Sequence, residues 1–229
     1  MQDPSATAPL TGISSMATRQ LLAELVSAWD RPVAIESVGG VDATKRVQGG
    51  EAFDVVVLAS TAIDKLIAEG HLLPGRVDIA RSGVAVAVRA GAARPAIGTE
   101  DALRRAVEAA RSISYSTGPS GVHLARLFER WGIAAQISDR IVEAPPGIPV
   151  GSLVARGEVE LGFQQLSELM HLDGIAVLGP LPPAVQVLTT FSAGVGVHSA
   201  RPDAARAFLH HLASPAAADA KHRHGMEPA

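Results

Sequence analysis

The sequence contains no cysteine and few aromatic residues. The absence of cysteine excludes disulfides, zinc–thiolate sites and a cysteine nucleophile among the 229 residues. Aromatic residues make up 3% of the chain, so its core must be built from Ala, Val, Leu and Ile. The interleaved aromatic and basic residues of an RNA-binding domain are also missing. A hydrophobic content of 47% still predicts a folded chain with a sizeable core.

The chain also lacks an excess of basic residues and long apolar runs. Its formal net charge is -3, so nothing in its charge would attract nucleic acid. No apolar run reaches the roughly 18 residues of a membrane span, and we expect no membrane insertion. Residues 1–9 lack the basic start and hydrophobic stretch of a secretory signal. We expect a periplasmic location if a signal peptide has been removed, and a cytoplasmic one otherwise.

Short β-rich runs alternate with amphipathic helical stretches. Residues 54–58 (DVVVL) form an apolar run typical of a strand buried on both faces. Residues 15–29 carry a stripe of leucines that predicts a helix. The same reasoning predicts strands at residues 11–14, 32–38, 77–89, 112–115, 140–142, 160–163 and 187–197, and helices at 42–47, 60–69, 99–110, 120–131, 148–156, 202–213 and 214–224.

Strands that alternate with helices predict an α/β fold with largely parallel sheets covered by helices. Two such series, joined by the long β-rich segments 77–89 and 187–197, predict two lobes. We expect the chain to cross near Ser82 and near Thr189. Lobe 1 would then contain residues 1–82 and 190–229, and lobe 2 residues 83–189.

Three loops between a predicted strand and a helix start are rich in small polar residues. They are residues 12–16, 37–42 and 116–121. Backbone N–H groups at a helix start favour an anion by about 0.3–2 kcal/mol per terminus. Ordinary helix capping explains any one loop alone, whereas three such loops in a two-lobed pattern favour a site for a small anionic ligand.

The eight histidines do not form a metal-binding pattern. His210, His211, His222 and His224 lie on predicted C-terminal helices, without the carboxylate context of a zinc site. Nucleotide-binding glycine motifs and the Gly-x-Ser-x-Gly motif are absent as well. We therefore expect neither a metal nor a cofactor.

Several motifs together resemble the molybdate-binding branch of the type II periplasmic solute-binding proteins. The resemblance runs from about Thr11 to the C-terminus. It implies a two-lobed type II periplasmic binding protein fold, with mixed β-sheets flanked by helices and a ligand cleft between the lobes. The motifs are Ser14-Ser15, GGVDATKR at 39–46, FDVVVL at 53–58, ARSGVAV at 80–86, STGPSGV at 116–122, RGEVELGFQQ at 156–165 and GMEP at 225–228.

In that family, hydroxyls and backbone N–H groups from four loops hold the anion. Two departures weaken a molybdate assignment: Gln165 stands where molybdate binders usually have Tyr, and the second loop has glycines and Asp42 in place of Ser or Thr. The ligand-binding residues implied by position are Ser14, Ser15, Gly40, Val41, Asp42, Ser120, Gly121, Val122, Val150 in the turn from Pro149 to Gly151, and Gln165.

The resemblance implies a solute-binding protein, usually a monomer, that captures an oxyanion such as molybdate, or a small carboxylate, for the permease of an ABC-type importer. The same branch includes aconitate isomerase, which shifts a double bond in a tricarboxylic acid by proton transfer. In that alternative Asp42 would be the base, and Lys45, Arg46 or Arg81 would hold carboxylates. A cytosolic ligand sensor is a third hypothesis.

The competing structural interpretations of these residues stay open. Asp42 is also suited to cap a helix, and Lys45 and Arg46 to a solvated helix face. Arg81 is equally suited to pair with Asp78.

Overall fold

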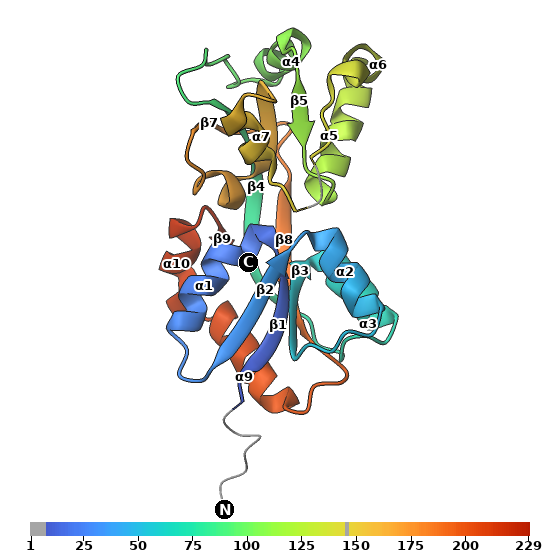
Figure 1. The fold of residues 1–229 in the computed structure, drawn as a ribbon, viewed down its shortest axis with the longest axis vertical. Helices are drawn as coiled ribbons and strands as arrows, with labels where there is room; N and C mark the ends of the chain where they lie inside the picture. Colours follow the sequence, from blue (N-terminus) through green and yellow to red (C-terminus); the bar gives the residue numbers. More distant parts are fainter. Residues whose placement is uncertain (1–7, 145–146) are drawn as a thin grey trace, which may run out of the picture. The chain divides into compact units, whose positions relative to one another are not determined.

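The computed structural model describes residues 8–144 and 147–229 (Figure 1). Contacts within the chain divide it into two compact units. Unit 1 comprises Met1–Arg81 and Thr190–Ala229, and unit 2 comprises Ser82–Thr189. The chain enters unit 2 within strand β4 (Val77–Arg89) and leaves it within strand β8 (Leu188–Val195). Each unit has its own strands, helices and core.

The sheet of unit 1 contains parallel strands in the order β2–β1–β3, followed by β8, which is antiparallel to β3. Strand β1 comprises Leu10–Ser15, β2 Val33–Val38 and β3 Val55–Ala59. The short C-terminal strand β9 (Glu227–Pro228) pairs with the first part of β4. The helices of unit 1 are α1 (Arg19–Ser27), α2 (Gly40–Gln48), α3 (Ser60–Ala68), α9 (Pro202–Ala213) and α10 (Ala218–Arg223), with 3-10 turns at Met16–Thr18 and Pro215–Ala217.

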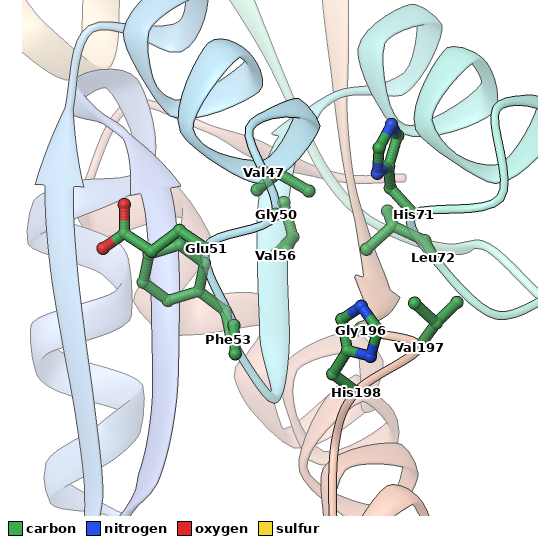
Figure 2. A pocket seen from close by; sticks show the side chains of 11 residues that line it. Val47, Gly50, Glu51, Phe53, Val56, His71, Leu72, Gly196, Val197 and His198 are labelled. Carbon is green, nitrogen blue, oxygen red and sulfur yellow. The ribbon is translucent and has the colours of Figure 1, made fainter.

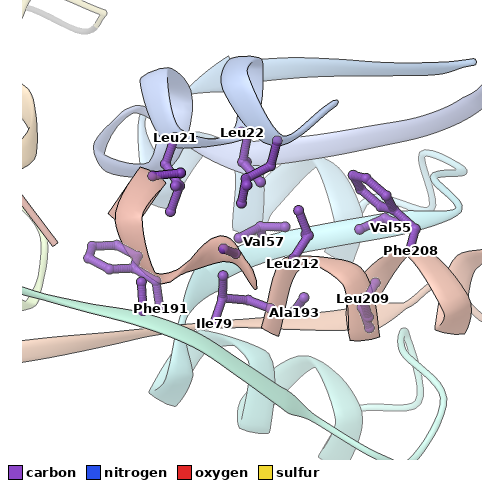
Figure 3. Close-up of a cluster of buried hydrophobic side chains, with 14 of the residues drawn as sticks. Leu21, Leu22, Val55, Val57, Ile79, Phe191, Ala193, Phe208, Leu209 and Leu212 are labelled. Atoms are coloured by element: carbon purple, nitrogen blue, oxygen red, sulfur yellow. The ribbon is translucent and has the colours of Figure 1, made fainter. Parts of the chain in front are cut away.

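Strand β3 is buried on both faces, as its apolar run predicts. Successive side chains of a strand point to opposite faces of the sheet. Val55 and Val57 therefore pack with residues of α1 and α9 (Figure 3). Val56 and Leu58 pack with residues of α2 and α3 on the other face. The carboxyl ends of β1, β2 and β3 thus lie together at one edge of a sheet that has helices on both faces.

The sheet of unit 2 is mixed. Strand β6 (Leu161–Gln165) lies between β4, to which it is antiparallel, and β5 (Ile113–Tyr115), to which it is parallel. Strand β7 (Ile175–Pro180) pairs with β4 in antiparallel fashion. The helices of unit 2 are α4 (Glu100–Ala109), α5 (Pro119–Arg130), α6 (Ala134–Ile137), α7 (Val150–Arg156) and α8 (Leu166–Leu169), with a 3-10 turn at Ser138–Arg140.

The core of unit 2 follows the alternation in β4. Val84, Val86 and Val88 belong to the cluster that includes Phe128 and Phe163. Ala85 and Ala87 face the other way and contact Leu169 of α8. Small alanines on that face leave room for α8 close to the sheet.

One predicted strand is wrong, and four short elements, α6, α8, β7 and β9, were not predicted. The segment 140–142 is not a strand: only Ile141 forms a bridge, to Ile113. Arg140 instead donates hydrogen bonds to the carbonyls of Glu108 and Ala110, at 2.9 and 2.8 Å, which ties the 3-10 turn to the end of α4. Strand β7 was not predicted, because its short apolar run ends in Gly179, whose φ of 137° is unusual for a strand.

Candidate functional site

The first half of the candidate site lies at the carboxyl edge of unit 1, where the parallel strands β1 and β2 end. Ser14 is paired in register with Ser37, and Ser15 with Val38. The segments that follow the two strands therefore leave the sheet side by side. Ligands of open α/β sheets bind beyond such strand ends.

The two predicted serines of β1 differ in their hydrogen bonding. The Ser14 hydroxyl lies 2.8 Å from the Ser37 hydroxyl, and Ser14 is fully buried. The Ser15 hydroxyl is also buried, but it has no hydrogen-bond partner among the described residues. A buried hydroxyl without a partner is uncommon, because it costs about 1–3 kcal/mol. Ser15 is therefore the better candidate of the two serines for a hydrogen bond to a ligand.

The start of helix α2 supplies backbone donors beside Ser15. Within α2 the first amide to donate is that of Ala43, to the carbonyl of Gly39 at 2.8 Å, so the amides of Gly40, Val41 and Asp42 have no partner in the helix. A methyl group on Gly40 would lie 3.7 Å from the Cβ of Ser15. The Ser15 hydroxyl and the start of α2 are thus close enough to contact one small anion.

Asp42 lies inside the first turn of α2 and not at its N-cap. The N-cap is Gly39, with no side-chain capping bond. A Cβ placed on Gly39 would lie 3.2 Å from Oδ2 of Asp42, so the carboxylate reaches back over the start of the helix. The structure therefore does not support the interpretation of Asp42 as the N-cap.

The basic residues that were candidates for holding carboxylates have other partners or positions. Arg46 contacts Glu36 at 2.9 Å and Glu51 at 2.5 Å in the last turn of α2, and the hydrogen bond to Glu51 is the largest cause of its raised pKa. Lys45 is exposed in the same turn. The remaining candidate, Arg81, donates to the carbonyl of Pro228 at 3.1 Å.

Asp78 is not paired with Arg81. Its carboxylate accepts from Arg76 at 2.9 Å and from the Ser192 hydroxyl at 2.6 Å. The predicted Arg81–Asp78 pair is thus replaced by an Arg76–Asp78 pair. The donors at the carboxyl edge of unit 1 are consequently neutral hydroxyl and amide groups.

In unit 2 the predicted residues at the start of α5 are largely satisfied within the unit. The Ser120 hydroxyl lies 2.9 Å from that of Ser116. The amides of Gly121 and Val122 both donate to the carbonyl of Gly118, at 3.0 and 3.2 Å. A Cβ on Gly121 would lie 1.5 Å from the Ser116 carbonyl oxygen, so only glycine permits this tight turn.

The other predicted residues of unit 2 are buried in hydrogen-bond networks. Val150 is the first residue of α7, and the amide of the next residue, Gly151, donates to Oε1 of Gln164 at 3.1 Å. The Gln165 amide is best satisfied when its oxygen accepts from Thr189 at 2.8 Å and its nitrogen donates to the carbonyl of Ser82 at 3.0 Å. Gln165 thus holds together the two ends of unit 2.

A carboxyl group that sequence reasoning missed lies beside these residues. Glu168, in the first turn of α8, is half-buried and accepts from Nε2 of Gln164 at 2.6 Å. Burial raises the pKa of Glu168 to about 7, although the bond from Gln164 acts in the opposite direction. A single glutamate in a short helix carries no sequence signal of this environment.

A small pocket in unit 1 lies away from the predicted residues (Figure 2). It is lined by the segment before β3, including Glu51 and Phe53, and by His71 and His198. Because β8 is antiparallel to β3, these segments meet at the amino edge of the sheet, opposite Ser15. The pocket therefore does not contain the candidate anion site.

Over residues 8–144 and 147–229, no group of three or more His, Cys, Asp or Glu side chains is arranged to hold a metal ion. Within the same residues, no helix is long and apolar enough to cross a membrane.

The family model of the bacterial extracellular solute-binding proteins matches residues 10–227. The chain belongs to this family. Its fold is that of the two-lobed periplasmic binding proteins, as the similarity to solved structures confirms. The predicted membership of a solute-binding protein family is likewise confirmed.

Among solved structures, the chain is similar to the periplasmic molybdate-binding protein of Azotobacter vinelandii. The TM-score is 0.77, with 22% identity over 95% of this chain and 98% of the other. It is similar to the tungstate ABC transporter protein of Geobacter sulfurreducens with a TM-score of 0.73 and 18% identity, over 94% and 98% of the two chains. Likenesses at this level of identity establish the fold alone.

A relative of much higher identity is an aconitate isomerase of a Pseudomonas species. It is 42% identical over 185 residues, which cover 80% of this chain and 70% of the relative.

Proposed function

We propose that the protein binds a small unsaturated tricarboxylate and isomerises it by moving a proton between two carbons. The observation that carries this proposal is the 42% identity to an aconitate isomerase, against 22% and 18% to the molybdate and tungstate proteins. The reaction needs no redox change and no group transfer, so residues of the chain are sufficient for it.

The geometry of unit 1 supports an anionic ligand. Among the described residues the Ser15 hydroxyl has no hydrogen-bond partner, and the first amides of α2 have none within the helix. Each hydrogen bond to a charged ligand contributes about 1.5–3 kcal/mol, and the positive end of α2 adds to this. The same donors suit one carboxylate of a tricarboxylate.

The two departures from the molybdate pattern favour a carboxylate over a tetrahedral oxyanion. The side-chain amide of Gln165 accepts from Thr189 and donates to the carbonyl of Ser82, so these bonds compete with donation to a ligand. The second loop offers Asp42, whose charge would oppose a compact dianion bound close to the start of α2. A larger ligand can place its carboxylate beside Ser15 and its other groups farther away.

A second candidate function is capture of a small anion for an ABC-type importer. The family to which the chain belongs favours it, and so does the fold shared with binding proteins for molybdate and tungstate. The family also supports a periplasmic location. In this hypothesis the same donors bind the ligand, but no proton moves.

A thermal-shift series tests the proposed ligand. The protein is heated with cis-aconitate, trans-aconitate, citrate, molybdate, tungstate or sulfate at millimolar concentration. A ligand at about 100 times its Kd adds about 2.7 kcal/mol, which raises Tm by several degrees for a chain of this size. We expect stabilisation by the aconitates. Stabilisation by molybdate or tungstate alone would contradict the proposal.

A further inference from the structure

We propose that Glu168 is the base that moves the proton in this isomerisation. The inference rests on the proposed function and names the residue that carries it out. Asp42, the base suggested by sequence, is an exposed side chain in the first turn of a surface helix. Glu168 is a half-buried carboxyl of unit 2 that is not paired with an arginine in the described structure, unlike Glu100 and Glu108, and α8 follows the carboxyl end of β6.

The position of Glu168 follows from three contacts. Strands β5 and β6 are parallel, so the Ser116–Ser120 turn and α8 both follow the carboxyl edge of this sheet. Glu168 accepts from Gln164 at 2.6 Å, and Gln164 accepts from the amide of Gly151 at 3.1 Å. This chain of hydrogen bonds fixes the carboxyl of Glu168 relative to the start of α7, where Val150 lies.

Apolar side chains pack around α8. Leu169 of the same helix packs against Ala85 and Ala87 of β4, and α7 contacts α8 at Gly151. Only burial and the bond from Gln164 shift its pKa, with no contribution from a neighbouring charge. The charged or titratable groups on the surrounding elements are Arg156 of α7, which is paired with Glu158 at 2.5 Å, Asp78, Arg81 and Arg89 of β4, and His171 and Asp173 after α8.

This environment suits removal of a proton from carbon. A base with a pKa near 7 is stronger than an ordinary carboxylate and is still about half deprotonated at neutral pH. A carboxylate paired with an arginine would be weaker. Gln164 orients the group without neutralising it.

The step balances without an additional reactant. The Glu168 carboxylate removes a proton from the methylene carbon of the ligand. The released electron pair forms the new double bond, and the electron pair of the old double bond moves onto the far carbon, with its charge spread over the adjacent carboxylate. The protonated Glu168 then gives the proton to that carbon. The residue ends as a carboxylate, and nothing is oxidised or reduced.

The test compares wild type, Glu168→Gln and a control, Glu129→Gln, which alters an exposed carboxylate on α5 of the same unit. Interconversion of cis- and trans-aconitate is measured from pH 5 to 9, and Kd for cis-aconitate is measured by calorimetry. We expect Glu168→Gln to lower kcat by about 10²–10⁴-fold, with Kd changed by less than about fivefold. Glu129→Gln should match wild type.

A second variant keeps the proposal falsifiable if Glu168→Gln is poorly folded. For wild type, kcat/KM should fall about tenfold per pH unit below a pKa of about 7. Because the bond from Gln164 lowers that pKa, Gln164→Leu should move the acid limb to higher pH. If Glu168 had only a structural role, kcat/KM of Gln164→Leu would fall on the acid side at the same pH as kcat/KM of wild type.

The outcomes separate the two proposals. A wild-type chain that interconverts the aconitates while Glu168→Gln is equally active would overturn the role of Glu168 and leave the proposed function standing. The role of Glu168 would also be overturned if kcat/KM of Gln164→Leu fell on the acid side at the same pH as kcat/KM of wild type. A wild-type chain without activity would overturn the proposed function and the role of Glu168 together.

Discussion

The two units differ in the hydrogen-bond donors at the carboxyl ends of their parallel strands. Unit 1 leaves donors unused: the Ser15 hydroxyl is buried without a partner among the described residues, and the first amides of α2 have none in the helix. Unit 2 uses its own donors, since the amides of Gly121 and Val122 bond to Gly118. What unit 2 adds is a carboxyl with a pKa of about 7. Unit 1 is therefore distinguished by unpaired donors, and unit 2 by a carboxyl group with a raised pKa.

The same contrast appears in the two notable carboxyl groups. Asp54 of unit 1 is buried, which raises its pKa, but bonds from Ser199 and Thr11 and the charge of Arg201 outweigh burial and hold the pKa below its usual value. Among the described residues, Glu168 of unit 2 accepts a hydrogen bond from the neutral amide of Gln164. Burial therefore dominates the pKa of Glu168, whereas hydrogen bonds and a nearby arginine dominate that of Asp54.

The largest expected effect concerns the tight turn of unit 2. Gly121→Ala places a Cβ 1.5 Å from the Ser116 carbonyl oxygen, so the backbone must shift. We expect a loss of more than about 4 kcal/mol in the free energy of unfolding, measured by urea denaturation. Gly98→Ala is the matched control, because no atom lies within 4 Å of its Cβ. Equal stability of the two variants would contradict the described turn.

The next effect is the opposite pH dependence of the two carboxyl groups. The folded-state pKa of Glu168 is raised from 4.5 to about 7, so the folded protein binds this proton more tightly than the unfolded chain does. This contribution to the free energy of unfolding is fully present below pH 4.5 and is lost as pH rises through 7. Glu168→Gln should therefore be more stable than wild type at pH 8, by about 3 kcal/mol at most, and similar to it at pH 4.5.

Asp54 should behave in the reverse manner. Its pKa is lowered, so its contribution is present above the ordinary Asp pKa of about 4 and is lost as pH falls further. Asp54→Asn should cost about 2 kcal/mol at pH 7, because hydrogen bonds to a charged acceptor are weakened. The penalty should shrink toward pH 2. Urea denaturation at several pH values gives the free energy of unfolding of both variants relative to wild type. If this difference changed with pH in the same direction for both, the predicted opposite behaviour of Glu168 and Asp54 would be contradicted.

The smallest expected effect compares two serines. Ser15→Ala removes a hydroxyl that has no hydrogen-bond partner among the described residues, so stability should change little while Kd for the anion rises about tenfold or more. Ser120→Ala removes a hydroxyl already bonded to Ser116 and should cost about 1 kcal/mol of stability, with less than a threefold change in Kd. Calorimetric titration checks both. A larger rise in Kd for Ser120→Ala than for Ser15→Ala would show that the anionic ligand binds at Ser120 of unit 2 and not at Ser15 of unit 1.

Much of the fold was predictable because local patterns agree with it. The apolar run before Leu58 marked β3, and the bounds of β4 and α9 match their predicted segments. The failures have physical reasons. The segment at Arg140 reads as β-rich, yet its side chain is drawn to the end of α4. Strand β7 is short, and Gly179 near its end interrupts the apolar run that would predict a strand.

The candidate site was only partly predictable. Loop composition pointed to Ser15 and Gly40, which lie together because β1 and β2 are parallel neighbours. Sequence alone did not distinguish Ser14 from Ser15, because the difference is a hydroxyl of Ser37 on the next strand. Glu168 was not predicted because its raised pKa depends on burial in the folded structure, which no local sequence pattern encodes.

The most direct test of the account is proton NMR of trans-aconitate with a catalytic amount of the wild-type protein at pH 7.5. The account predicts that signals of cis-aconitate grow at a rate proportional to protein concentration, and that Glu168→Gln abolishes this growth. A spectrum that matches the protein-free solution, together with a rise in Tm on adding molybdate, would contradict the isomerase and favour an oxyanion carrier.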